Sequence, residues 1–372
     1  MDMPALSVVP HPAAADALGS PGVGRTGGLE TLRKLGTEDI GMTETTPIVF
    51  KGELYRFESV RSGNWNNTLN CTNNAPGEGR RCAQHLRFRR QSGPPGWTTG
   101  EVVTSFGVGY DFGCAFVDKD ETVFAYASGT GVAAPGVRGT SATVTSWSSP
   151  TISPASTWVQ RTALELGPGY TVFNTAVAVG MLGDKETYVM AIEVRHAQLG
   201  GGFQLVFATA PSASGPWKLG QSLPSKGLMF GPGSCPALRY DSGSGFWHLL
   251  YTPNPTVPDG DYRTWQVWAA RSRTLAFGSW TMSPMNPVMV ADAFDRQIHN
   301  EEIRHDEQGW ASNTTDLNDS DPDLVEFEGH VLFVGNWGDQ RTTPTNSLYQ
   351  AVYKGSMTQF WASLYPPSGW PV

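Results

Sequence analysis

One pattern of apolar and polar residues occurs five times along the chain. In each copy, a short apolar segment leads into a turn rich in Gly and Asp, and a second apolar segment then ends in small or polar residues. Apolar residues alternate with others on both sides of the turn, which predicts a β-hairpin. The five predicted hairpins are Thr46–Glu58, Cys114–Tyr126, Thr175–Glu193, Pro236–Tyr251 and Asp323–Val334.

A tryptophan follows four of these hairpins, after a turn of small residues or proline. The four are Trp97, Trp158, Trp217 and Trp280. Their common position predicts a fourth, outer strand in each unit, and a spacing of roughly 60–90 residues between hairpins suits four strands with long loops. We therefore expect an all-β fold, a five-bladed β-propeller of four-stranded antiparallel blades. A two-sheet β-sandwich is the alternative, although a sandwich gives no reason for the repeat.

The predicted propeller domain covers residues 42–372, and residues 1–41 are predicted to be an N-terminal arm or linker that wraps or closes the ring. This segment lacks the charged start and continuous apolar block of a secretory signal, which leaves export open. No stretch reaches the roughly 20 apolar residues that span a bilayer, so we expect a soluble protein without membrane insertion.

Composition narrows the range of partners. The chain has 34 acidic and 26 basic residues, a formal charge of −8, and no long run of Lys or Arg, so nucleic acid is not an expected partner. Cys71 and Cys82 bracket a loop rich in Gly and Asn, and whether a disulfide joins them is left open. His196, His299 and His305 do not have metal-ligand spacing. We expect no metal and no cofactor, and the oligomeric state is not predicted.

Many polar residues lie at the ends of the predicted strands that open on one face of a propeller. The starts of inner strands and the ends of second strands open on the same face, around the central channel. Candidates at inner-strand starts are Glu44, Thr45, Thr46, Asp111, Asn174, Ser234, Cys235, Asp321 and Asp323. Candidates at second-strand ends are Glu58, Arg61, Ser128, Glu193, Arg195, His196, Tyr251, Thr252, Trp337, Asp339 and Gln340.

This mixture of carboxyl, guanidinium and aromatic groups is typical of a sugar site. Glycosidic cleavage uses two carboxyl groups, and aromatic rings supply flat apolar surface for a pyranose face. Glu193 follows the apolar residues 190–192 at the end of a predicted strand, where a turn residue is not expected. Asp321 and Asp323 have an alternative role as turn caps before a strand. Arg61 and Arg195 either bind a substrate carboxylate or pair with Glu58 and Glu193.

Other catalytic classes lack their motifs. The chain has no Gly-x-Ser-x-Gly elbow, no phosphate-binding loop and no paired-Cys motif. Hydride transfer and phosphoryl transfer are therefore disfavoured.

Several segments together resemble a known group of proteins. They are Leu54–Arg61 with Trp65 and Asn67, Phe173–Thr175, Tyr188–Glu193, Ser234–Ala237, Asn318–Asp323 and Trp337–Gln340. With these segments the chain resembles the five-bladed propeller glycoside hydrolases, which include arabinanases, xylosidases and invertase-like enzymes. It is more similar to a related bacterial and eukaryotic set of glycosyl hydrolases. The resemblance implies a carbohydrate substrate and hydrolysis of O-glycosidic bonds.

The resemblance also implies catalytic roles for acids from three blades. The group's first-blade Asp precedes a Pro, but here Thr46 does so, and Glu44 or Glu58 would have to replace that acid. Asp111 matches the second-blade acid, Glu193 is the expected proton donor, and Asp321 is the expected base or nucleophile. The residues expected to bind substrate are Glu58, Arg61, Asn174, Arg195, Tyr251, Asp323, Trp337, Asp339 and Gln340.

Three hypotheses follow from the sequence. The leading one is an exo-acting glycoside hydrolase that takes a terminal sugar into the propeller mouth. The second is a carbohydrate-binding propeller without catalysis. It is suggested by Thr46, which stands where the group has its first-blade Asp. The third is a related enzyme that transfers or phosphorolyses glycosyl groups.

Overall fold

The computed structural model describes most of the chain and leaves several loops and both ends outside the description. The described residues are 32–40, 43–60, 85–94, 96–129, 141–220, 227–253, 265–301, 303, 309, 311–314, 318–338 and 347–366. Regular structure within them is almost entirely β-strand. None of the helices described there has the length and apolar character needed to cross a membrane.

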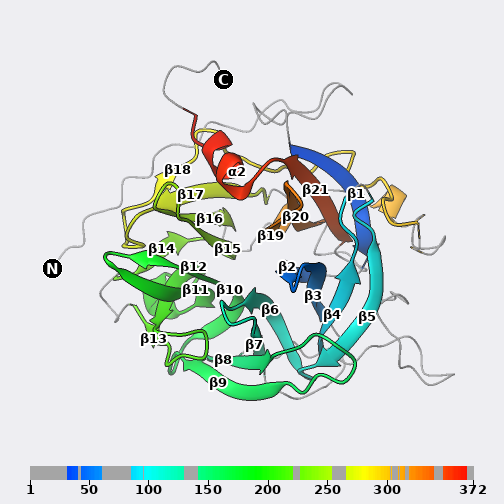
Figure 1. The fold of residues 1–372 in the computed structure, drawn as a ribbon. Helices are drawn as coiled ribbons and strands as arrows, with labels where there is room; N and C mark the ends of the chain where they lie inside the picture. The colour runs from blue at the N-terminus through cyan, green and yellow to red at the C-terminus, as the bar shows by residue number, and fades with distance from the viewer. Residues whose placement is uncertain are drawn as a thin grey trace.

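The strands form five antiparallel sheets arranged as blades around a centre (Figure 1). Blade 1 contains β2 (Thr43–Phe50), β3 (Glu53–Val60), β4 (His85–Gln91) and β5 (Thr99–Phe106). Blade 2 contains β6 (Tyr110–Val117), β7 (Val123–Gly129), β8 (Thr143–Ser149) and β9 (Val159–Glu165). Blade 3 contains β10 (Thr171–Leu182), β11 (Lys185–Arg195), β12 (Phe203–Ala210) and β13 (Lys218–Leu219), with β14 (Met229–Pro232) added against β12.

The remaining strands form the last two blades. Blade 4 contains β15 (Ser234–Asp241), β16 (Phe246–Thr252), β17 (Trp268–Ser272) and β18 (Thr281–Met282). Blade 5 contains β19 (Asp319–Phe327), β20 (His330–Trp337), β21 (Ser347–Lys354) and β1 (Leu32–Ile40). The predicted all-β fold of five four-stranded blades is confirmed, and β14 is the one addition.

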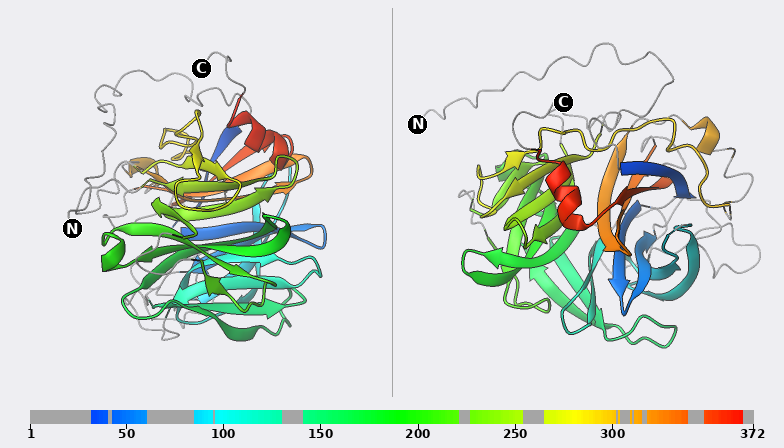
Figure 2. Two further views of the ribbon diagram at one scale, coloured as in Figure 1. Left: turned by 90° about the vertical axis from the view of Figure 1, so that its left-hand side faces the viewer. Right: turned by 45° about the horizontal axis from the view of Figure 1, so that its top comes forward.

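The ring is closed by the first described strand. β1 pairs antiparallel with β21, so the outer strand of blade 5 comes from the opposite end of the chain to its other three strands (Figure 2). β1 lies inside the segment 1–41 that was predicted to be an arm or linker. We therefore propose that the propeller begins at Leu32 rather than at residue 42.

The repeated tryptophans mark the outer strands, as the sequence analysis expected. Trp97 lies just before β5, Trp158 before β9, Trp217 before β13 and Trp280 before β18. Trp217 is buried and donates from Nε1 to the backbone oxygen of Ala213 at 3.2 Å. Each tryptophan therefore packs at the point where the chain enters the outer strand of its blade.

Apolar clusters between neighbouring blades hold the ring together. Trp247 of β16 is fully buried among residues of blades 3 and 4, and its Nε1 donates to the backbone oxygen of Met181 at 3.0 Å. The helix α2 (Met357–Ser363) begins with a capping box between Ser356 and Gln359 and buries Phe360 and Trp361. A single-turn 3₁₀ helix, η2, covers Ala197–Leu199. The five inner strands β2, β6, β10, β15 and β19 are neighbours in a closed circle.

Candidate active site

Each inner strand carries a β-bulge close to its start. The pairing register shifts after the first residues of β2, β6, β10, β15 and β19, so the inner strand has an extra residue opposite its partner. The first bulged residues are Glu44, Phe112, Phe173, Cys235 and Asp321, and all but Phe173 have a positive φ, between 44° and 55°. Non-Gly residues in this region are strained, and bulges re-aim side chains next to functional sites. Three of these residues, Glu44, Cys235 and Asp321, line one cavity, whereas Phe112 and Phe173 pack against each other.

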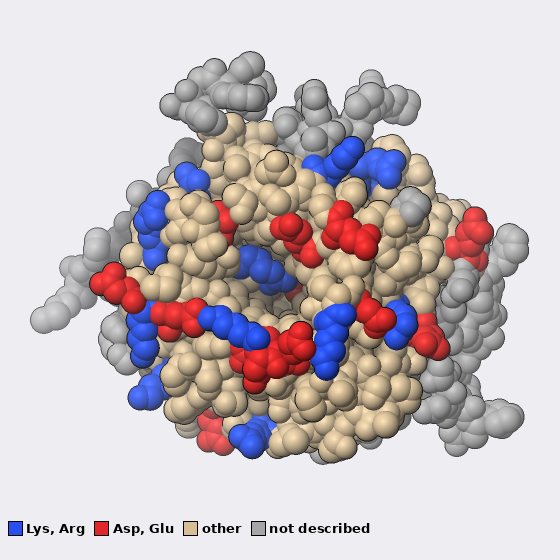
Figure 3. All heavy atoms as spheres, in the orientation of Figure 1, with Lys and Arg blue, Asp and Glu red and all other residues tan. Residues whose placement is uncertain are grey.

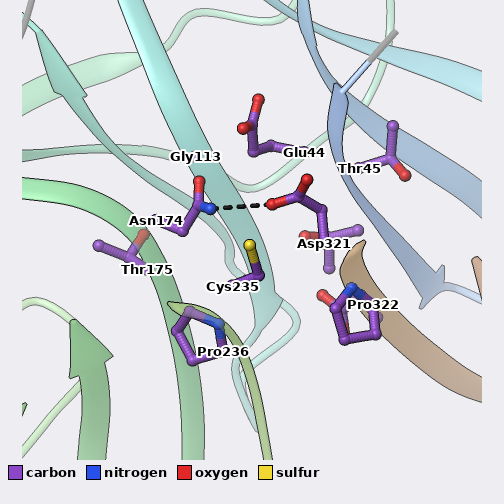
Figure 4. Close-up of a pocket in the computed structure, with 11 residues that line it drawn as sticks. Glu44, Thr45, Gly113, Asn174, Thr175, Cys235, Pro236, Asp321 and Pro322 are labelled. Atoms are coloured by element: carbon purple, nitrogen blue, oxygen red, sulfur yellow. Dashed lines mark hydrogen bonds between the residues drawn. The ribbon is translucent and has the colours of Figure 1, made fainter. Parts of the chain in front are cut away.

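A small acidic cavity lies where the bulges meet (Figure 4). It is open to solvent, and all five blades contribute to its wall. The lining residues are Glu44, Thr45, Thr46, Gly113, Asn174, Thr175, Cys235, Pro236, Asp321, Pro322 and Asp323. Gly113 is required here because a Cβ would lie 2.9 Å from the backbone oxygen of Tyr126.

Glu193 lies behind the wall of this cavity, in contact with two of its lining residues. It lies near the end of β11 with 3% of its surface exposed, and its Oε2 accepts hydrogen bonds from the backbone N–H of Cys235 at 2.7 Å and from Asn174 Nδ2 at 3.2 Å. Its Oε1 accepts no hydrogen bond within the described part of the chain, so this oxygen is the one available to carry a proton.

The environment of Glu193 favours the protonated form. Burial raises its pKa to about 8, and the negative charge of Asp321 acts in the same direction, against the opposing effects of the Cys235 N–H and of Arg195. At neutral pH the carboxyl group therefore holds its proton. A buried carboxyl with a pKa near the working pH has the property that a general acid needs.

Asp321 accepts more side-chain hydrogen bonds than Glu193, although the Asn174 side chain contacts both carboxyl groups. Asn174 Nδ2 donates to Asp321 Oδ1 at 2.9 Å, while Asn336 Nδ2 and Ser320 Oγ donate to Oδ2 at 3.1 and 3.0 Å. Three donors on one carboxyl group hold its orientation. The predicted pair of Glu193 and Asp321 is thus brought together by Asn174, which was also predicted.

Glu44 adds a third carboxyl group to the cavity from β2, on the blade next to Asp321. The sequence left Glu44 and Glu58 open as replacements for a first-blade acid. The structure separates them because Glu44 lines the cavity and Glu58 does not. Asn336 was missed by the sequence analysis, since an Asn inside an apolar strand gives no signal for its partner.

The floor of the cavity is an ion pair. Asp323 Oδ1 accepts from Arg239 Nη2 and from the backbone N–H of Leu324 at 2.8 Å. Burial raises the pKa of Asp323, and the positive charge of Arg239 opposes that rise. Arg239 also lines a second, mostly apolar cavity, formed by the later parts of the inner strands. The pair therefore separates the acidic cavity from the rest of the channel.

The ring is hollowed at its centre on the face that Figure 3 presents. Charged side chains of both signs surround that hollow. The lining of the acidic cavity differs from the surroundings of this hollow, because it contains carboxyl groups but no Lys or Arg.

Glu58 was predicted to bind substrate, but it lies in a buried cluster of arginines. It is fully buried and accepts from the Nε atoms of Arg56, Arg87 and Arg89 at 2.7, 2.5 and 3.2 Å. Burial alone would raise its pKa, yet the three guanidinium groups hold the pKa of Glu58 well below its usual range. Asp39 of β1 joins the cluster through Arg56 at 3.0 Å. Glu58 therefore ties blade 1 to blade 5, outside the cavity.

Two aromatic residues predicted to contact sugar are also buried in the blades. Tyr251 has 3% of its surface exposed, packs on Phe230 with ring centroids 4.5 Å apart, and directs its hydroxyl to Met282 Sδ at 3.3 Å. Trp337 is fully buried, and its Nε1 donates to Thr37 Oγ1 at 3.1 Å. Neither lines the cavity. Residues at strand ends still alternate between blade faces, and these two face neighbouring strands.

We expect Tyr251→Phe to leave kcat and KM unchanged on any substrate that the protein cleaves. The hydroxyl makes a weak contact with a thioether, so its loss should change the free energy of unfolding by about 1 kcal/mol or less. Steady-state kinetics and urea unfolding of the variant beside the parent test this. A large rise in KM would contradict this prediction and indicate that Tyr251 contacts the sugar.

The other predicted residues fall outside the cavity wall. Asp111 is the second residue of β6, is almost fully buried and accepts a hydrogen bond from the backbone N–H of Phe112 at 2.9 Å. Arg195 is exposed and stacks on Phe203, with its guanidinium carbon 3.9 Å from the ring centroid. The expected pairing of Arg195 with Glu193 is absent among the described ion pairs, although its charge acts on the Glu193 pKa. Four of the predictions concern residues outside the described ranges: Arg61, Asp339, Gln340 and the Cys71–Cys82 pair.

Metal ligands are not grouped in the described part of the chain. No three His, Cys, Asp or Glu side chains there are placed to hold a metal ion. Cys114 and Cys235 are buried free thiols.

These observations define a five-bladed β-propeller with an acidic cavity at its centre. No protein-family model matches the chain, and no curated protein matches it. Among solved structures, the α-L-arabinofuranosidase of Podospora anserina in complex with cellotriose is similar, with a TM-score of 0.51 and 11% identity over 87% of this chain and 98% of that chain. The α-L-arabinanase of Cellvibrio cellulosa complexed with arabinohexaose has a TM-score of 0.50 and 10% identity over 89% and 99%.

A third similar structure is an exo-1,5-α-L-arabinanase from a bovine ruminal metagenomic library. Its TM-score is 0.50, with 10% identity over 90% of this chain and 97% of that chain. Identities this low show a shared fold. The fold implied by the sequence resemblance is thereby confirmed.

Proposed function

We propose that the protein is a glycoside hydrolase that cleaves a terminal sugar by carboxylate catalysis in the propeller mouth. The observation that carries this proposal is the pair of Glu193 and Asp321, joined by Asn174 and held in contrasting environments. One carboxyl with a raised pKa beside a carboxylate with several donors is the division of labour that glycosidic cleavage requires.

Each residue has a distinct role in this proposal. Glu193 is the general acid that protonates the leaving oxygen from Oε1, and Asp321 acts on the anomeric carbon or on a water. Asn174 is a positioning residue because it touches both carboxyl groups. Glu44 lines the same cavity and binds sugar hydroxyls or tunes the charge of Asp321.

The ion pair between Asp323 and Arg239 lies at the base of the cavity and supports a site for a chain end rather than for the middle of a chain. The carboxyl-rich lining without Lys or Arg favours a neutral sugar over an anionic one.

The comparisons agree with a carbohydrate partner. Two of the similar structures contain cellotriose or arabinohexaose, and all three are named as arabinofuranosidase or arabinanase. The sequence segments that resemble propeller glycoside hydrolases include Phe173–Thr175 and Asn318–Asp323, which supply Asn174 and Asp321.

A carbohydrate-binding propeller without catalysis is the second candidate. Two observations favour it: Glu193 is only 3% exposed and stands behind the cavity wall, and Thr46 occupies the position of the expected acid. In that case the cavity would bind sugar while no bond is cleaved.

One experiment separates the two candidates. The protein is incubated with a panel of aryl glycosides and oligosaccharides, beside Asp321→Asn, and calorimetry with the same sugars is run in parallel. We expect product release by the parent and its loss in the variant. Binding heat with no product from any sugar would favour the binding protein, and release that requires phosphate would favour phosphorolysis.

Hydrolysis should fall as the pH rises through about 8. The general acid acts only when protonated, and the raised pKa of Glu193 keeps it protonated up to that pH. An ordinary Glu would lose its proton near pH 4.3, so the rate would then begin to fall at a much lower pH. The dependence of kcat/KM on pH, measured on one cleaved substrate, checks the prediction. A basic limb below pH 6 would contradict the assignment of Glu193.

A further inference from the structure

We infer that the second cavity of the central channel binds a small neutral aromatic molecule whose polar end is a hydrogen-bond acceptor, such as an aryl ketone. This cavity is formed by the later parts of the inner strands and is separate from the acidic cavity at their starts. The site is independent of the proposed hydrolysis. Three features point to it: the apolar wall, two N–H groups of Arg239, and the charges of the turns beyond the wall.

The inner strands change from polar to apolar along their length. Their first residues line the acidic cavity, whereas the segments 47–49, 115–117 and 177–179 line the second cavity, together with Tyr240 and Val325. The second cavity has a volume of about 280 Å³. A dry apolar cavity of roughly 150 Å³ is enough to bind benzene. One aromatic ring with a short substituent therefore has room here.

Two aromatic side chains in the wall favour a flat ligand. Phe116 and Tyr240 line the cavity and are both partly exposed. Phe116 packs edge-on against Tyr188 with ring centroids 6.0 Å apart, and Tyr240 packs against Trp247 at 5.1 Å. These contacts hold the two rings in place behind the wall. An aromatic ligand gains from such rings beyond the area that it buries.

Arg239 supplies the polar contact. A guanidinium group has five N–H donors. Here Nη1 donates to the backbone oxygen of Leu238 at 2.7 Å, and Nη2 donates to Asp323 and to the backbone oxygen of Leu324 at 2.7 Å. The Nε–H and one Nη1–H have no acceptor within the described part of the chain. With 23% of its side chain exposed, Arg239 can donate these hydrogens to a ligand oxygen.

The surrounding charges favour a neutral ligand over an anion. The Arg239 charge is already balanced by Asp323. The turns that follow the lining segments, at 51–53, 118–121, 183–186, 241–244 and 326–329, contain nine Asp or Glu residues and three Lys residues. A carboxylate entering past them would be repelled, and it would compete with Asp323 for Arg239. A ketone oxygen accepts the same hydrogen bonds without carrying a charge.

Three probes of nearly equal size test the chemistry of the site. The full chain, labelled at its Val methyl groups, is titrated by NMR with acetophenone, benzoate and ethylbenzene. We expect acetophenone to bind once per chain and at least about tenfold more tightly than the other two, since only it is both neutral and an acceptor. Tighter binding of benzoate, equal binding of ethylbenzene, or no binding of acetophenone would overturn the inference.

Variants that fill the cavity locate the site. Val325→Phe and Val117→Phe each place a ring where the ligand would lie, and each should weaken acetophenone binding at least about tenfold. Val159→Phe is the matched control, because Val159 is 48% exposed on β9 and lies outside the lining. It should bind as the parent does. Urea unfolding shows which variants are folded, and parental affinity in a folded cavity-filling variant would overturn the inference.

Discussion

Glu193→Gln is expected to slow the release of poor leaving groups by about 10²–10⁴-fold, the usual contribution of a general acid. Gln keeps the size of the side chain and its hydrogen bond from Cys235, but it has no proton to give. Substrates with activated leaving groups need less protonation, so the same variant should retain much more of its rate on them. Rates on a series of aryl glycosides with graded leaving groups measure this difference.

Glu186→Gln is the matched control for this variant. Glu186 lies on the same strand, is exposed and pairs with Lys119 at the surface. We expect its kinetics to equal those of the parent on every substrate. Equal loss of rate on good and poor leaving groups in Glu193→Gln would show that Glu193 holds the site together rather than donating a proton.

Glu58→Gln is expected to lower the free energy of unfolding by about 3–5 kcal/mol. Removing one partner of a buried ion pair leaves uncompensated charge in the interior, and here three arginines lose their shared carboxylate. The Arg56 link to Asp39 of β1 should weaken with it, so the closure of the ring is affected. Urea unfolding of the variant beside the parent measures the change.

Glu53→Gln provides the comparison on the same strand. Glu53 pairs with Arg90 at 3.3 Å, but both side chains are about half exposed, and surface pairs contribute roughly 0–1 kcal/mol. Its unfolding midpoint should stay close to that of the parent. A Glu58→Gln protein of unchanged stability that has lost sugar binding would contradict the buried role of Glu58.

The repeated hairpins could be predicted because alternation, turn residues and tryptophan positions are all local signals. Residues 1–41 were predicted to wrap or close the ring, but the strand that closes it could not be located, since nothing in residues 32–40 indicates a partner some 300 positions later in the chain. The addition of β14 to blade 3 also depends on tertiary pairing alone.

Strand position alone indicated that three of the candidate residues lie close together. Asn174, Glu193 and Asp321 lie at strand starts or ends that meet at the mouth, and the structure joins them. The prediction was wrong for Tyr251 and Trp337, which lie at the correct ends of their strands but on faces that pack within the blades. Which face a strand-end residue takes depends on twist and on bulges, and neither is visible in the sequence.

The position of Glu44 in the cavity wall also depends on a bulge that the sequence does not show. Its positive φ of 44° places it on a bulge, and the bulge brings the side chain to the cavity wall. A non-Gly residue with that backbone gives no sequence signal. Glu58, by contrast, looks like a site acid in the sequence, because the arginines that surround it come from β3 and β4 and only folding brings them together.

The central claim is that Glu193, behind the cavity wall and joined to Asp321 through Asn174, stays protonated at neutral pH. The most direct test is the titration of Glu193 in the free protein by carbon-13 NMR of labelled Glu carboxyl groups, with Glu193→Gln used to assign its signal. The account predicts a midpoint at about 8. A midpoint near 4.3, the value of an ordinary Glu, would contradict it.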